Sequence, residues 1–188
     1  MIEERSDDDL MLAYGRGDAR AFEQLYARYR KPLYRYVYHA VGNRALADDL
    51  YQDIWSRIID ARARFTANKG FRRYAFRIAH NRLVDHWRAA GRHGTVDAQA
   101  LDQLPADDQQ QPEQMSERDQ QAWQLKQALM QLPPEQREAF LLQQEAGLSL
   151  ADIAERGGVG RETVKSRLRY AVQRLRLILK PNPEGLPP

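Results

Sequence analysis

Cysteine is absent from the 188-residue sequence, which excludes disulfide bonds and thiolate metal sites and is compatible with a reducing compartment. Long apolar runs are absent as well. The longest, from Leu10 to Tyr14, falls far short of the roughly 20 residues that a membrane-spanning helix requires. The N-terminus is acidic where a secretory signal would have basic residues before an apolar run. We therefore expect a soluble, cytoplasmic protein that does not insert into a membrane.

Sequence signatures of enzymes are also missing. The four histidines form no HExxH pair and no ligand spacing with acidic residues on one helical face. No phosphate-binding loop, nucleophile elbow or dinucleotide fingerprint occurs. The sequence thus predicts no catalytic residue, no metal site and no cofactor. The enzymatic alternative is a metal-dependent nuclease, which would cleave DNA in the presence of magnesium.

Helical periodicity dominates what is present. Hydrophobic residues make up 43% of the chain and charged residues 29%, which suits a packed core. Apolar residues recur every three or four positions and no segment alternates with the period of a strand, so we predict an all-α fold. Helices are expected over residues 7–15, from Asp18 onward, from Pro32 to about Gly42, over 45–59 and over 70–90, with a loop at 62–69.

A change of composition divides the chain. Residues 95–117 contain six acidic residues, two prolines and no lysine or arginine, which is typical of a flexible acidic linker. We therefore predict a first helical domain over residues 1–92, a linker over 93–118, a second domain over 119–180 and a proline-rich tail over 181–188.

The strongest local motif is a helix-turn-helix near the C-terminus. Ser149 and Asp152 have the spacing of a capping box that begins a short helix, and Gly157-Gly158 permits a sharp turn. The buried stripe of the second helix is expected to contain Val164, Leu168, Val172, Leu175 and Leu179.

The outward side of that second helix is cationic, with seven lysines or arginines and one acid between residues 161 and 180. In this motif the N-terminal half of the second helix enters the DNA major groove. The candidate DNA contacts are Arg161, Thr163, Lys165, Ser166, Arg167, Arg169 and Tyr170. Lys165 and Arg169 can donate to guanine acceptors, or contact phosphate or solvent, and the sequence leaves these roles open. A helical hairpin with a solvated basic face is the alternative.

A second cationic segment lies in the first domain. Between residues 72 and 92 there are six arginines and one acid, interleaved with Tyr74, Phe76 and Trp87. Proteins that bind single strands combine phosphate attraction with aromatic stacking in this way. Tyr74 is expected either to stack on a base or to pack in the core.

Four sequence blocks together resemble the extracytoplasmic-function (ECF) sigma factors, the compact initiation subunits of bacterial RNA polymerase in the sigma-70 family. These blocks are GDARAFEQLYARYRKPLYRYV at residues 17–37, ADDLYQDIW at 47–55, FRRYAFRIAHNRLVDHWR at 71–88 and the helix-turn-helix. The resemblance implies that the second block docks on a coiled coil of the polymerase β′ clamp. By position, the contact residues would be Asp49, Leu50, Gln52, Asp53 and Trp55.

The resemblance also implies that the third block reads and melts the −10 promoter element, while the helix-turn-helix reads the −35 element. The −10 residues would be Arg72, Arg73, Tyr74, Arg77, His80, Asn81 and Arg88, with loop 62–69 walling the pocket for a flipped base. This chain has Tyr74 and Ala75 where the family often has tryptophan and a bulky aliphatic, and Glu162 where the family frequently has glycine. Core packing is the expected role of Leu50 and Ile54, and a solvated face is the alternative for Asp49, Gln52 and Asp53.

The partners implied by the resemblance are core RNA polymerase (the β′ clamp and the β subunit), promoter DNA and an anti-sigma factor. Elements about 17 base pairs apart are separated by roughly 60 Å. A linker of this length spans at most about 90 Å when extended and about 30 Å as a coil, so it bridges them when partly stretched. The linker either threads the polymerase or acts as a spacer. A helix-turn-helix regulator of another family is the alternative function.

Overall fold

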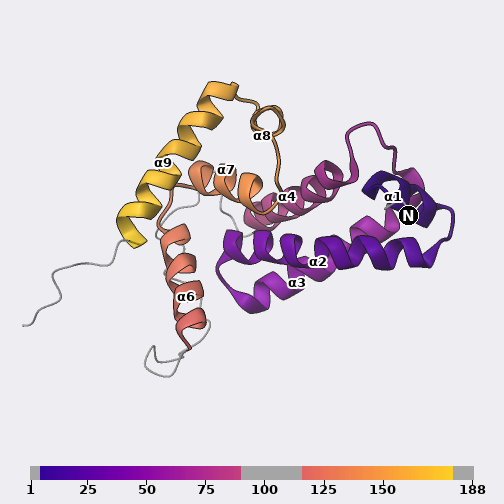
Figure 1. Ribbon diagram of the computed structural model, residues 1–188, viewed down its shortest axis with the longest axis horizontal. Coiled ribbons are helices and arrows are strands. Elements are labelled where there is room, and N and C mark those ends of the chain that lie inside the picture. The colour runs from indigo at the N-terminus through magenta and orange to yellow at the C-terminus, as the bar shows by residue number, and fades with distance from the viewer. Residues whose placement is uncertain (1–4, 90–115, 180–188) are drawn as a thin grey trace, which may run out of the picture.

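The computed structural model describes residues 5–89 and 116–179, and the described part of the chain is helical throughout (Figure 1). The first half consists of α1 (Asp7–Gly15), α2 (Ala19–Val41), α3 (Arg44–Asp60), the 3-10 turn η1 (Arg62–Arg64) and α4 (Phe71–Ala89). The second half consists of α6 (Glu117–Met130), α7 (Pro134–Gln144), α8 (Leu150–Gly157) and α9 (Arg161–Leu179). The predicted all-α fold is confirmed. No helix among those described has the length and apolar character needed to cross a membrane.

Side-chain caps set the beginnings of the first helices. Ser6 caps α1, Asp18 caps α2 and Asn43 caps α3, each by accepting a hydrogen bond from a backbone amide in the first turn. Gly42 ends α2 in the left-handed conformation, which glycine adopts without strain. The predicted start of a third helix at Pro32 is wrong, because α2 continues through that residue.

The physical reason is the apolar stripe of α2, which runs unbroken on both sides of the proline. Proline inside a helix removes one hydrogen bond and costs about 3 kcal/mol. Burying a single leucine-sized side chain recovers about 1.5–3 kcal/mol. The buried stripe of α2 contains Leu25, Tyr29, Leu33, Tyr36 and Val37, so tertiary packing outweighs the local cost.

The core of the first half lies between α1, α2, α3 and α4. Leu10, Leu50, Ile54 and Ile58 are almost fully buried there. Phe76 is 0% exposed and packs edge-on against Tyr36, with ring centroids 5.4 Å apart, so its predicted place among the stacking aromatics is wrong. Phe76 lies three and seven residues before the buried Ala79 and Leu83, so the helical period turns it toward the core rather than toward solvent.

The second half follows the predicted helix-turn-helix closely. The Ser149–Asp152 capping box is present at the start of α8, and Gly158 makes the turn with φ of 62°. Two details differ. Helix α6 is capped by Ser116 and begins at Glu117, so it takes up the end of the predicted linker. The buried stripe of α9 includes Ala171 in place of the predicted Val172, which is half-buried, and Leu179 in the last turn is 41% exposed.

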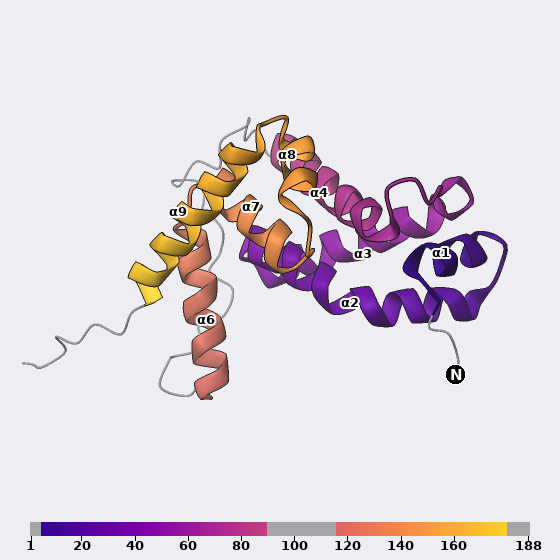
Figure 2. The same ribbon diagram turned by 45° about the horizontal axis from the view of Figure 1, so that its top comes forward.

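The two halves pack against each other (Figures 1 and 2). Helix α2 contacts α6 and α7, and α8 lies beside α4 in both views. A Cβ atom on Gly42 would lie only 2.8 Å from Met130 Sδ, so the backbone of the first half approaches the second half closely there. Most of the predicted linker, residues 93–118, and the predicted tail lie outside the described residues.

Replacing Phe76 by alanine should lower the free energy of unfolding by about 3–5 kcal/mol, the usual cost of emptying a buried phenylalanine site. Urea unfolding followed by circular dichroism measures the change. Gln120→Ala, at an exposed position of α6, should change the free energy by less than about 0.5 kcal/mol. Equal stability of the two variants would contradict the placement of Phe76.

Candidate nucleic-acid interface

Five of the seven predicted −10 residues line one cavity of about 520 Å³. They are Arg73, Tyr74, Arg77, His80 and Asn81, all on α4. The segment before α4 supplies another wall through Arg64, Thr66, Asn68 and Lys69. The predicted loop and the predicted helix therefore enclose the same space, which is large enough for a planar base and is lined with hydrogen-bond donors.

Tyr74 combines partial packing in the core with a place on the cavity wall. Its ring packs edge-on against Phe65, with centroids 5.2 Å apart, while Arg77 lies over the ring at 5.6 Å. The side chain is half-buried and lines the cavity. Partial burial raises the pKa of Tyr74, so the hydroxyl stays protonated at neutral pH. Tyr74 is thus a fixed aromatic wall that retains a neutral hydrogen-bonding group.

Carboxylates of α8 close the far side of this cavity. Arg73 pairs with Asp152 at 2.8 Å and with Glu155 at 2.7 Å, and Lys69 also pairs with Glu155. These acids therefore pair with Arg73, one of the cations that were predicted to attract phosphate. Asp152 was predicted only to cap α8, and no role was predicted for Glu155. The i,i+3 spacing of the two acids places them on one side of α8, but no local pattern in the sequence pairs that side with α4.

Two histidine–glutamate pairs join the halves beside the cavity. His80 Nδ1 lies 2.8 Å from Glu138 Oε1, and His39 Nδ1 lies 3.4 Å from Glu145 Oε1. Arg35 also pairs with Glu145, at 2.7 Å. Each of these contacts joins α2 or α4 to α7 or its C-terminal cap.

The surroundings keep these glutamates ionised. Burial raises the pKa of Glu138, but the hydrogen bond from His80 and the charges of His80, Arg156 and Arg167 together lower the pKa below its ordinary value. Burial also raises the pKa of Glu145, while the contacts with His39 and Arg35 lower it. The net result is a pKa below the ordinary value. A carboxylate whose pKa is lowered in the packed form stabilises that form fully when the pH is above the carboxylate's ordinary pKa. This contribution is lost as the pH falls through the lowered pKa.

Arg72 and Arg88 lie away from the cavity. Arg72 stacks over Tyr29 at 5.8 Å and donates to the backbone oxygen of Ala146 at 3.3 Å. Arg88 is exposed near the end of α4. Conversely, Arg156 of α8, for which no role was predicted, lines the cavity and donates to the backbone oxygen of Phe76.

The predicted −35 residues lie on the N-terminal half of α9. Arg161, Thr163, Lys165, Arg169 and Tyr170 are exposed, and Ser166 and Arg167 are half-buried. Val164 and Leu168 anchor this half of the helix from below, each less than 10% exposed. Glu162, whose side chain is 87% exposed, lies 3.7 Å from Lys165, so it points along the cationic face. The surface that faces a major groove in a helix-turn-helix is thus open.

Only part of the predicted polymerase-contacting block lies on the surface of α3. Leu50 and Trp55 are 1% and 5% exposed, and Trp55 packs edge-on against Phe22 at 5.8 Å. The expected core packing of Leu50 is confirmed, and the predicted surface contact of Trp55 is corrected, because its ring fills the core. Asp49 and Gln52 are exposed, while Asp53 is half-buried between Arg57 and Arg82. In the described ranges 5–89 and 116–179, no cluster of side chains could hold a metal ion.

Comparison with known proteins identifies both halves. The family model for sigma-70 region 2 matches residues 25–93, and the model for sigma-70 region 4 matches residues 122–175. The ECF RNA polymerase sigma factor SigM of Mycobacterium tuberculosis is 33% identical over 94% of this chain and 86% of its own length. The RNA polymerase sigma-H factor of Pseudomonas aeruginosa is 29% identical over 96% and 97% of the two chains.

Two solved structures share the arrangement of helices. The sigma factor RpoE of Bartonella quintana, in complex with the anti-sigma factor NepR, matches with a TM-score of 0.67 and 27% identity, over 85% of this chain and 96% of that chain. CnrH, in complex with the cytosolic domain of CnrY, matches with a TM-score of 0.61 and 25% identity, over 92% and 97%.

Glu155→Lys should separate the two halves, because it replaces two attractions with repulsion from Lys69 and Arg73. The chain has no cysteine, so dyes can be attached at Lys31→Cys and Gln173→Cys, both exposed positions, and the separation followed by energy transfer. We expect the open population to rise by about three- to ten-fold. Glu135→Lys makes the same charge change at an exposed position of α7 and should leave energy transfer unchanged.

Proposed function

The chain belongs to the ECF group of the sigma-70 family and is a transcription initiation factor, and on this premise we propose that its two halves divide promoter recognition between them. The second half reads the −35 element with the cationic face of α9. The first half binds core RNA polymerase and captures the melted −10 strand in the cavity beside α4. The observation that carries this division is the convergence of loop 62–70 and α4 on one cationic, aromatic-walled cavity.

Promoter opening needs no nucleotide hydrolysis in this scheme. Flipping a base out of the duplex costs a few kcal/mol, and stacking on an aromatic side chain returns about 1–3 kcal/mol per base. Tyr74 offers such a ring, and Arg64, Arg73 and Arg77 offer charge for the backbone phosphates. The captured strand therefore offsets much of the cost of opening the duplex. The chain itself carries out no catalytic step, because the polymerase performs the chemistry.

Core polymerase docks on the exposed side of α3. Asp49 and Gln52 lie there on a helix held rigid from behind by Leu50 and Trp55. Asp53 supports the same face indirectly, because it bridges α3 to Arg82 of α4. We assign the β′ clamp to this surface and the β subunit to the second half, and we place the protein in the bacterial cytoplasm.

The packed arrangement is the silent form of the factor. Asp152 and Glu155 occupy cations of the −10 cavity, so a DNA strand binds there only after α8 moves away. The chain matches two sigma factors whose structures contain an anti-sigma factor or a cytosolic partner domain, along most of their length. We assign this chain an anti-sigma partner that stabilises the packed form. A regulator of another helix-turn-helix family loses support, because both halves match sigma-70 regions.

In vitro transcription tests the proposed function directly. The full chain is added to purified core RNA polymerase and genomic DNA fragments from its host. It should give promoter-specific transcripts without any ATP hydrolysis that serves to open the promoter. Core polymerase alone provides the baseline. Absence of specific transcripts from every fragment, or DNA cleavage by the isolated chain with magnesium, would contradict the proposal.

Substitutions should separate the two recognition steps. Arg169→Ala should weaken −35 binding by about 5- to 150-fold, the range for one good base contact, while core binding stays unchanged. Arg174→Ala, at an exposed position one turn further along α9, is its control.

Asp49→Ala should weaken core binding without affecting −35 binding, and Asp60→Ala, exposed at the end of α3, is the matched control. Fluorescence anisotropy with labelled DNA or labelled core measures both affinities. Loss of both affinities in one variant would argue against the division.

A further inference from the structure

Helix α4 begins without a capping side chain of its own. The residue before it is Gly70, which has φ of 82° and no side chain. The first turn carries Arg72 and Arg73, and cations near a helix N-terminus are unfavourable for the helix dipole. The helix that lines the −10 cavity therefore needs a cap from elsewhere in the fold.

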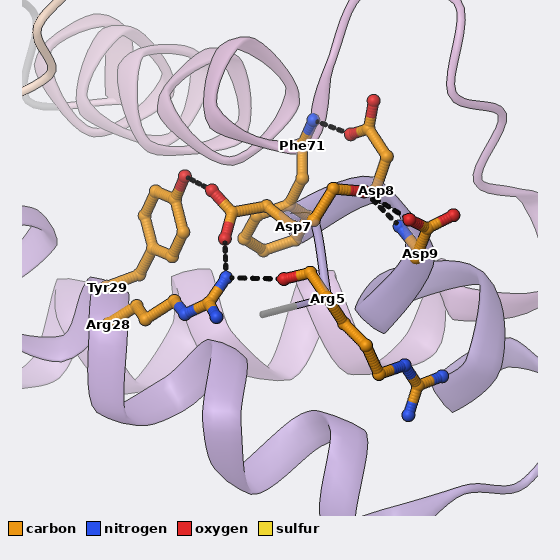
Figure 3. A network of polar contacts seen from close by, with 8 residues as sticks. Arg5, Asp7, Asp8, Asp9, Arg28, Tyr29 and Phe71 are labelled. Atoms are coloured by element: carbon orange, nitrogen blue, oxygen red, sulfur yellow. Dashed lines mark hydrogen bonds and ion pairs between the residues drawn. The ribbon is translucent and has the colours of Figure 1, made fainter. Parts of the chain in front are cut away.

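Asp8 of α1 supplies this cap from 63 residues away. Its Oδ1 accepts a hydrogen bond from the backbone amide of Phe71 at 2.5 Å, at the start of α4 (Figure 3). The carboxylate charge also suits the positive end of the α4 dipole. The side chain comes from a helix that lies before residue 25, where the match to sigma-70 region 2 begins.

The neighbouring Asp7 holds the same junction from the side. It accepts hydrogen bonds from the Tyr29 hydroxyl and from Arg28, the latter at 2.6 Å (Figure 3). Tyr29 packs edge-on against Phe71, with ring centroids 4.9 Å apart. The first turn of α1 thus fixes both the backbone and the first side chain of α4.

The C-terminal end of α1 contacts the beginning of the loop that precedes α4, residues 62–70. A Cβ atom on Gly15 would lie 2.9 Å from the backbone oxygen of Arg62, and the Arg62 guanidinium lies over the Tyr14 ring at 5.7 Å. Leu10 and Met11 are fully buried between these two ends, so α1 is held firmly by the core. Helix α1 therefore spans the segment from Arg62 to Gly70 and holds it at both ends.

We propose that α1 is a brace for the strand-binding cavity and that Asp8 is a positioning residue for −10 recognition, which rests on the function proposed above. Loop 62–70 carries four of the cavity-lining side chains, Arg64, Thr66, Asn68 and Lys69. Fixing its two ends preorganises these side chains before the strand arrives, and preorganisation raises affinity by lowering the ordering cost of binding. Asp8 contacts no DNA in this scheme and acts through the position of Phe71 and the loop.

The test uses the full chain bound to core polymerase and a DNA probe with a duplex −35 region and a single-stranded −10 non-template strand. Affinity is measured for probes that carry each of the four bases at each −10 position. Asp8→Ala should reduce the preference for the best base by about ten-fold. Asp8→Asn keeps an acceptor oxygen for the Phe71 amide and should retain most of the preference.

Asp9→Ala is the matched control, because Asp9 lies in the same turn and bonds to Ser6 within α1. It removes the same charge and should leave base preference unchanged. Gly15→Ala tests the brace at its other end, since the added methyl group displaces the Arg62 carbonyl while alanine favours the helix. We expect it to reduce base preference as Asp8→Ala does, and it decides the matter if Asp8→Ala does not fold.

The outcomes separate the two proposals. Equal base preference in the wild-type chain, Asp8→Ala and Gly15→Ala would overturn the brace, even if both variants melted at a lower temperature. No preference in the wild-type chain would instead overturn the proposed −10 function. A loss in Asp8→Ala that Asp8→Asn also shows would mean that the carboxylate charge carries the effect, and the role assigned to the hydrogen bond with the Phe71 amide would be wrong.

Discussion

The ion pairs between α4 and α8 determine how the rest of this molecule can act. Arg73 binds two carboxylates of the second half, and Lys69 shares one of them. Both halves are built to bind the same polyanion, so their cationic surfaces would repel each other if no acids lay between them. Exposed ion pairs contribute only about 0–1 kcal/mol each. The packed form is therefore stable enough to exist and weak enough for a polyanion or a protein partner to displace it.

The packed form leaves the two cationic surfaces unequally accessible. The outer face of α9 is open, whereas the cavity beside α4 has acids on its far side. A site that is available only in a minor conformation binds with an affinity reduced by the fraction of that conformation. In the proposed division of promoter recognition, the upstream element thus meets a ready surface, while capture of the −10 strand depends on a prior separation. Polymerase bound at the proposed docking surface on α3 would be positioned to favour that separation.

The features that the sequence could predict are those encoded in short windows. Caps such as Ser149 act on residues three positions away, so the helix-turn-helix was predicted almost completely, and most of its candidate DNA contacts are exposed. The errors arise where distant packing decides the outcome. Helix α2 continues through Pro32 because its buried stripe outweighs one lost hydrogen bond, and Trp55 turns inward because aromatic rings of α2 surround it. The cationic half of the cavity was predictable, and its acidic half, with Glu155, was not, since no local pattern pairs α8 with α4.

The Asp8 cap is the clearest case of a contact between distant residues that no local sequence pattern predicts. A run of three acids at the start of α1 reads locally as a favourable first turn, and that reading is correct for α1 itself. The same run also contains the group that completes α4, because the fold brings the N-termini of the two helices together. A residue with two such roles is under two constraints at once. Its substitution weakens a helix that the sequence places 63 positions away, and the cavity beside that helix loses its fixed wall even though no cavity-lining side chain has changed.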